Sequence, residues 1–161
     1  MIPGRDYIGV GVGAMVFDAE GRVFLAKRGP HASNERGYWE FPGGKVGFGE
    51  KLVDGLRREF REEYDMDIEV VDLLSVDDHI LAQEKQHWVS LTYLARHTGG
   101  TPRIVEPGKC SEIGWFELTD LPTPLSVITE LDLGHYRQRL GEAKTNREGR
   151  EAGFARQGHS E

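Results

Sequence analysis

In the first third of the chain, an apolar run, a polar turn and a second apolar run predict a hairpin of two strands. The first apolar stretch, residues 8–17, reads IGVGVGAMVF. It suits a buried strand better than a helix, because a helix would have to carry its three glycines. A turn at residues 18–21 and a returning strand at residues 23–26 complete the hairpin, which leads into a loop at residues 29–37.

The second half of the chain shows further strand patterns and ends on a helix. Strands are predicted at residues 68–76, 87–96 and 113–118, and a second helix within residues 126–140. Strands before and after one central helix, with another helix at the end, indicate an α/β fold. The expected architecture is a mixed sheet that is covered on both faces.

Residues 52–64 form the predicted central helix. Its apolar side chains span about 120° of the helix surface, the width of a stripe that faces a core. Beside that stripe, Glu59, Glu62 and Glu63 are spaced i, i+3 and i+4, so that one edge of the helix is acidic. Either the arginines of the same helix balance these charges on a solvated face, or a divalent cation binds them, since hard cations prefer oxygen ligands.

Composition narrows the class of protein. The 161 residues fit one domain, and 38% apolar with 29% charged residues are typical of a globular protein. No apolar run approaches the roughly 20 residues needed to cross a bilayer, and residues 1–11 lack the basic start and apolar stretch of a secretory signal. The single cysteine, Cys110, cannot form an internal disulfide. We therefore expect a cytoplasmic protein with no membrane partner.

The net charge disfavours polymeric nucleic acid as a partner, and the distribution of charged residues separates a domain from a C-terminal tail. A formal net charge of −7 repels polymeric nucleic acid, whereas a small phosphorylated substrate stays compatible when a cation reverses the local field. Residues 141–161 are rich in charges, and Phe154 is their only large apolar residue, so they can bury little. We expect a domain of residues 1–140 and a polar, mobile tail of residues 141–161.

The residues before the central helix decide between the two interpretations of its acidic edge. From Gly44 to Met66 the chain reads GKVGFGEKLVDGLRREFREEYDM, that is Gly44, five residues, Glu50, seven residues and then REFREE. This segment resembles the signature box of the Nudix (MutT-like) hydrolase family. Asp65 stands where the family has a glycine, at a position that resembles a helix C-cap; Asp tolerates positive φ better than most residues do. The match favours the metal site.

The resemblance extends beyond the box. Residues 27–45, KRGPHASNERGYWEFPGGK, and residues 106–122, EPGKCSEIGWFELTDLP, are similar to the corresponding segments of nucleoside triphosphate members. The resemblance implies a Nudix-type α/β/α sandwich and an enzyme that cleaves a diphosphate linkage by attack of water on phosphorus. The activity implied best is a (deoxy)nucleoside triphosphate pyrophosphohydrolase that gives a monophosphate and pyrophosphate, with oxidised nucleotides such as 8-oxo-dGTP as candidate substrates.

The resemblance also assigns roles to individual residues. The implied ligands of Mg²⁺ or Mn²⁺ are the carboxylates of Glu59, Glu62 and Glu63 and the carbonyl of Gly43. Arg58 would orient these carboxylates, and Glu50 would anchor the loop to the helix. Glu59, Glu62 or an acid outside the box would accept the proton of the attacking water. Glu106 matches a loop glutamate of similar enzymes, and Glu112 is the second choice.

Substrate-binding residues are implied with less support. The candidates are Arg28 for the phosphates, Phe41 with Glu40 for the base, and Ser90 and Leu125 for the lining of the base pocket. Trp39 is expected in the core, and Phe48 either stacks on the substrate or closes over the core. His31, His79 and His87 show no metal-ligand spacing, and none is expected to be a ligand.

Three alternatives stay open at this point. The first is an ADP-ribose or sugar-nucleotide pyrophosphatase; some ADP-ribose members carry a proline shortly after the box, and the lack of one between Gly43 and Thr101 disfavours ADP-ribose. A non-catalytic regulator that binds nucleotides would typically have lost box carboxylates. An interaction module would act through the tail. Dimers are common among similar enzymes, so a homodimer is also left open.

Overall fold

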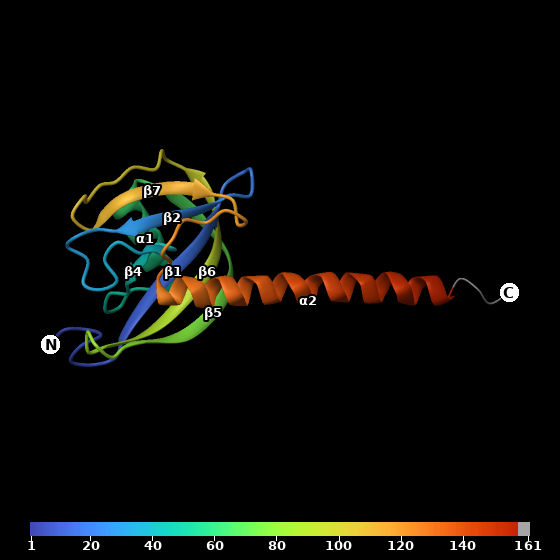
Figure 1. The fold of residues 1–161 in the computed structure, drawn as a ribbon, viewed down its shortest axis with the longest axis horizontal. Coiled ribbons are helices and arrows are strands. Elements are labelled where there is room, and N and C mark those ends of the chain that lie inside the picture. Colours follow the sequence, from blue (N-terminus) through green and yellow to red (C-terminus); the bar gives the residue numbers. More distant parts are fainter. Residues whose placement is uncertain (158–161) are drawn as a thin grey trace.

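The computed structural model describes residues 1–157 and contains one mixed sheet with a helix on either side (Figure 1). In chain order the elements are β1 (Gly9–Phe17), β2 (Val23–Arg28), β3 (Trp39–Glu40), β4 (Gly43–Lys45), α1 (Leu52–Tyr64), β5 (Asp67–Leu81), β6 (Gln86–Gly99), β7 (Cys110–Phe116) and α2 (Val127–Gln157). The bounds of α1 are those predicted from the apolar stripe. Each predicted strand is present, although β5 and β6 are longer than expected, and β7 begins and ends earlier than the predicted range 113–118.

The sheet is organised around β1. Its strand order is β3-β2-β1-β6-β5, with β4 also pairing with β1 and β7 with β2. β1 runs parallel to β6 along its whole length and antiparallel to β2 and β4. The sheet is therefore mixed, as predicted, and the first half of β1 lies between β4 and β6.

The two faces of the sheet form two separate cores. Successive residues of a strand point to opposite faces, and β1 shows this clearly. Ala14 and Val16 pack in a buried cluster with Phe60 of α1, whereas Met15 packs in another cluster with Leu133 of α2. This places the sheet between the two helices and confirms the layered α/β architecture.

The second helix extends further than predicted. It was expected to end by Leu140, but α2 continues to Gln157 and projects away from the sheet (Figure 1). Residues 141–151 are exposed, so local helix formers such as Ala, Glu, Lys and Arg, rather than packing, account for the extension. Whether residues 141–157 move relative to the domain stays a prediction, and residues 158–161 lie outside the described part of the chain.

Neither of the two helices that the structure describes has a stretch long and apolar enough to span a membrane.

Candidate active site

Glu50 fixes the loop that leads into α1. Its carboxylate accepts hydrogen bonds from the backbone N–H of Gly47 at 2.9 Å and from Arg58 Nε and Nη2 at 2.7 and 3.0 Å. These bonds, above all those from Arg58, lower the pKa of Glu50 to about 2. At the other end of the helix, Asp65 adopts the left-handed conformation with φ 55° and caps α1, as its position in the box predicted.

Arg58 also holds two carboxylates of the acidic edge. It donates to Glu59 Oε1 at 2.8 Å and to Glu62 Oε2 at 3.0 Å. Within residues 1–157, no three acidic, histidine or cysteine side chains are arranged as a group that could hold a metal ion. Part of the acidic edge is thus balanced by an arginine of the same helix, as the alternative to the metal site requires.

Glu63 lacks such a partner and lies among other carboxylates. Burial first, and then the charge of Glu59, with smaller effects of Glu40 and Glu106, raise the pKa of Glu63 to about 7, although Lys109 opposes that rise. The nearest cation is Lys109, whose Nζ is 4.0 Å from Glu63 Oε1. A bound divalent cation would relieve this surplus of negative charge, so the oxygen-rich donor set fits a hard cation such as Mg²⁺.

Two glycines of β4 let this cluster lie close to the sheet. A Cβ at Gly43 would overlap the backbone carbonyl of Val12 in β1, and a Cβ at Gly44 would overlap the carboxylate of Glu59. Any larger residue would push β4 away from β1 or displace Glu59. Steric contact therefore explains both the glycine directly before the box and the first glycine of the box.

A cavity of about 470 Å³ runs from these carboxylates across the sheet. Eight of the predicted site residues line it: Arg28, Glu40, Phe41, Gly43, Glu59, Glu63, Ser90 and Glu106. Arg28 donates through Nη1 to Glu40 Oε2 at 2.7 Å and through Nε to the backbone carbonyl of Asn34 at 2.9 Å. Burial raises the pKa of Glu40, while Arg28 opposes that rise. The structure thus brings most of the predicted residues around one space.

The family model of the NUDIX domain matches residues 8–136 of this chain. The protein belongs to the Nudix family. A solved structure described as a MutT NUDIX hydrolase from Burkholderia pseudomallei is 40% identical, with a TM-score of 0.74, over 81% of this chain and 98% of that one. The match confirms the family and the fold that the box implied.

Two curated Nudix relatives match shorter stretches. Human 8-oxo-dGDP phosphatase NUDT18 is 34% identical over 110 residues, which are 65% of this chain and 32% of the human protein. The 8-oxo-dGTP diphosphatase of Proteus vulgaris is 38% identical over 65 residues, 40% of this chain and 57% of that protein. The chain therefore spans only part of the length of these relatives.

Some predicted residues of the Nudix site lie outside the cavity. Arg58 and Glu62 are not among its lining residues, and the Glu62 side chain is 55% exposed. Glu112, the second choice for a base, pairs with Lys27 at 2.7 Å away from the cavity. Phe48 is fully exposed, whereas Trp39 is buried in the core as expected.

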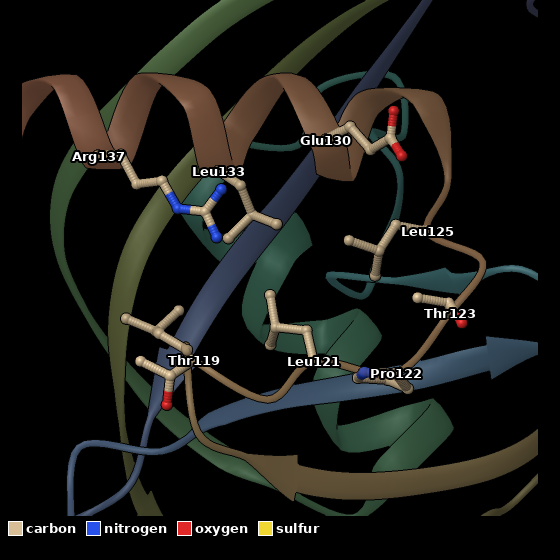
Figure 2. A pocket seen from close by; sticks show the side chains of 9 residues that line it. Thr119, Leu121, Pro122, Thr123, Leu125, Glu130, Leu133 and Arg137 are labelled. Carbon is tan, nitrogen blue, oxygen red and sulfur yellow. The ribbon is translucent and has the colours of Figure 1, made fainter.

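Leu125 lies at a different cavity. This second space, of about 360 Å³, is enclosed by the start of α2 and the segment that precedes it (Figure 2). Leu125 lines it together with Leu121 and Leu133, and its backbone pairs with Trp39 in an isolated bridge. The interpretation of Leu125 as part of the base pocket is therefore not supported by its position.

Sequence reasoning missed an acid in the wall of the Nudix cavity. Asp132 of α2 is buried and lines the cavity, and it accepts hydrogen bonds from Ser75 Oγ at 2.8 Å and Thr92 Oγ1 at 2.9 Å. Burial raises the pKa of Asp132 to about 6, against the opposite effect of the two hydroxyl groups. The one sequence signal was an aspartate directly before the buried Leu133 in the predicted second helix.

The loop between β2 and β3 supplies further cavity residues that the motif does not mark. Asn34 donates through Nδ2 to Gln86 Oε1 at 2.8 Å, so that the loop is joined to the start of β6. Glu35 Oε2 lies 3.6 Å from His79 Nε2, and both residues line the same cavity. These contacts link segments about 50 residues apart in sequence, and no local pattern could have found them.

Proposed function

We propose that the protein is a nucleotide pyrophosphohydrolase that depends on a divalent cation. The observation that carries the proposal is the cavity that joins the box carboxylates Glu59 and Glu63 to the phosphate-binding candidate Arg28 and the apolar wall of Phe41. This arrangement suits a substrate with a polyphosphate at one end and a base at the other. The named activities of the human and Proteus relatives, on 8-oxo-dGDP and 8-oxo-dGTP, support oxidised nucleotides as the substrate class.

The box residues would hold the cation, which is Mg²⁺ or Mn²⁺. Its ligands would be the carboxylates of Glu59, Glu62 and Glu63 and the carbonyl of Gly43. When bound, the cation would neutralise negative charge on the phosphate oxygens and favour ionisation of a water molecule. Glu59 and Glu62 would have to turn away from Arg58, which keeps its bonds to Glu50 and so stays in place to orient them.

Other residues of the chain would position the substrate and move the proton. Arg28 presents its guanidinium at the cavity wall, with Glu40 fixing its orientation at 2.7 Å. An acid must take the proton of the attacking water, and Glu106 lines the cavity close to Glu63. Glu106 is the candidate base outside the box, and its Oε2 lies 2.9 Å from Lys109 Nζ.

A panel of nucleotides tests this proposal. The protein would be incubated with Mg²⁺ or Mn²⁺ and nucleoside di- and triphosphates, oxidised guanine nucleotides, ADP-ribose and sugar nucleotides. Products would be identified by mass in ¹⁸O-labelled water, which marks the attacked phosphorus. We expect a monophosphate from the triphosphates, with release of pyrophosphate. Binding without turnover across the panel would overturn the proposal in favour of a nucleotide-binding regulator.

Two other expectations and one alternative belong with this proposal. A cytoplasmic location and a mobile C-terminal tail stay predictions, and a homodimer stays an open alternative. Light scattering of the purified chain would test the oligomeric state.

A further inference from the structure

The N-terminal turn, residues 2–7, is fixed against the start of β6. Asp6 accepts a hydrogen bond from the backbone N–H of Ile2 at 2.6 Å, and the carbonyl of Gly4 accepts one from the N–H of His87 at 2.7 Å. Figure 1 shows this segment beside the end of the β5–β6 hairpin. The turn is therefore a folded part of the domain and not a free end.

The ring of Trp88 supports the N-terminal turn. Gly4 has φ +79°, and a Cβ at Gly4 or at Gly9 would overlap the Trp88 ring. The Trp88 indole N–H donates to Gln86 Oε1 at 3.1 Å, and Gln86 lines the cavity. Because Gly4 and Gly9 lack a Cβ, the backbone can approach this ring closely, and this contact fixes the turn at the cavity wall.

Arg5, on this turn, is a cavity residue to which neither the Nudix box nor its flanking segments assign a role. The cations that line the cavity are Arg5, Arg28, Lys45 and Lys109. Two of them are already paired: Arg28 lies 2.7 Å from Glu40, and Lys109 lies 2.9 Å from Glu106. Among the described residues, neither Arg5 nor Lys45 has a carboxylate oxygen within 4.0 Å.

The two cations without a carboxylate partner lie at the same end of β1. Arg5 precedes β1 by four residues, counted to Gly9, and Lys45 pairs with Gly11 near the start of that strand. The cavity is otherwise strongly acidic, with the side chains of Glu35, Glu40, Glu59, Glu63, Glu106 and Asp132 in its lining. A polyphosphate that enters such a cavity needs cations that are not already neutralised by protein carboxylates.

We propose that Arg5 is a substrate-binding residue whose guanidinium binds non-bridging oxygens of the nucleotide's phosphate chain. A guanidinium fork matches two phosphate oxygens, and the exposed side chain of Arg5 is free to reach them. The inference rests on the proposed function, since it requires a nucleotide in this cavity. It adds a second phosphate-binding arginine, on an element outside the box.

Binding measurements with two probes test the role of Arg5. Titration calorimetry with Mg²⁺ would compare a non-hydrolysable α,β-methylene nucleoside triphosphate with the nucleoside that lacks phosphates. In Arg5→Ala we expect the Kd of the triphosphate to rise about tenfold, because a hydrogen bond between charged groups is lost, and the nucleoside to bind as in the wild type. Arg5→Lys keeps the charge and should weaken the triphosphate by only about threefold.

Arg96→Ala is the matched control. Arg96 is exposed and lies at the other end of β6, opposite Phe17, so its removal lowers the net charge equally without touching the cavity. Equal melting temperatures of all variants would show that they are folded. Triphosphate binding by Arg5→Ala within about twofold of the Arg96→Ala protein would overturn the inference.

Three combinations of results also count against the inference. Equal weakening of nucleoside and triphosphate would show that Arg5 acts only as a wall of the cavity. A wild-type chain that neither binds nor hydrolyses any nucleotide would overturn the proposed function, and the inference with it. A wild-type chain that hydrolyses nucleotides, together with an unaffected Arg5→Ala variant, would leave the proposed function standing and reject the role of Arg5 alone.

Discussion

Glu35 Oε1 accepts a hydrogen bond at 2.9 Å from the backbone N–H of Val127, the first residue of α2. The first N–H groups of a helix have no partner within the helix, and a carboxylate there also favours the helix dipole. Ser126 satisfies another such group, because its Oγ accepts from the N–H of Thr129 at 3.3 Å. The loop that lines the cavity therefore also caps the start of α2.

Removal of this cap should destabilise the domain. Glu35→Ala is expected to lower the free energy of unfolding by about 1 kcal/mol, and the melting temperature by about 2–4 °C. Glu35→Gln keeps an oxygen acceptor and should lose less. Thermal melting followed by circular dichroism measures both. An alanine variant as stable as the wild type would contradict a capping role for Glu35.

The box carboxylates should be required for hydrolysis and not for folding. Glu63→Gln or Glu62→Gln is expected to reduce kcat by at least about 100-fold under saturating Mg²⁺, since loss of charge stabilisation at a site of this kind costs that much. The fold should survive, because the pKa of Glu63 is already raised to about 7 and a neutral side chain is tolerated there. Glu112→Gln, which changes a carboxylate outside the cavity, is the control. Activity within tenfold of wild type would rule out the metal role of these glutamates.

The pH dependence of stability follows from the raised pKa of Glu63. In the unfolded chain the pKa is near 4.5 and in the folded protein about 7, so between these values the folded state binds more protons. The contribution of Glu63 is therefore fully present below pH 4.5 and is lost as the pH rises through 7. Metal-free wild type should lose more stability than Glu63→Gln between pH 5 and about 8.

Denaturant unfolding of both proteins across this pH range measures the difference. Added Mg²⁺ should stabilise the wild type more at pH 8 than at about pH 5, because the cation competes with the proton for the carboxylates. The same pH dependence in both proteins would show that Glu63 is not the responsible group.

Asp132, which lines the cavity, should also stabilise the folded domain. Asp132→Ala removes the acceptor of the Ser75 and Thr92 hydroxyl groups, both of which belong to buried residues. Leaving these groups without a partner is expected to cost about 1–3 kcal/mol of unfolding free energy, measured in urea. Glu130→Ala, an exposed position on the same helix, should cost almost nothing. Equal stability of the two variants would contradict the role of the buried network.

The projecting part of α2 should be dispensable for catalysis. Truncation after Leu140 removes residues of which 141–151 are exposed, so we expect kcat/KM to change by less than about twofold and the melting temperature by little. The nucleotide panel applied to the shortened chain measures this. A loss of hydrolysis on truncation would mean that the tail contributes to the site.

Local patterns were sufficient to predict the helix and the motif. The apolar spacing of residues 52–64 determines α1, because a helix repeats every 3.6 residues and its buried face can be read from a short window. Gly47, Glu50 and Arg58 interact within 20 residues of one another, so the resemblance of this short segment to the Nudix box already implied the anchored loop that the structure contains. The sequence by itself thus determined the family, the order of most elements and the position of the acidic edge.

Only the tertiary structure decided which side chains share the cavity. Asp132, Asn34 and Arg5 come from α2, a loop and the N-terminal turn, and packing of the sheet brings them together. The same packing places Leu125 at another cavity. Burial and charge compensation act between residues that are distant in sequence, so no window of the chain contains them. The extension of α2 beyond residue 140 was missed because the prediction ended the helix where its buried residues end. Local helix propensity, and not packing, continues the helix past that point.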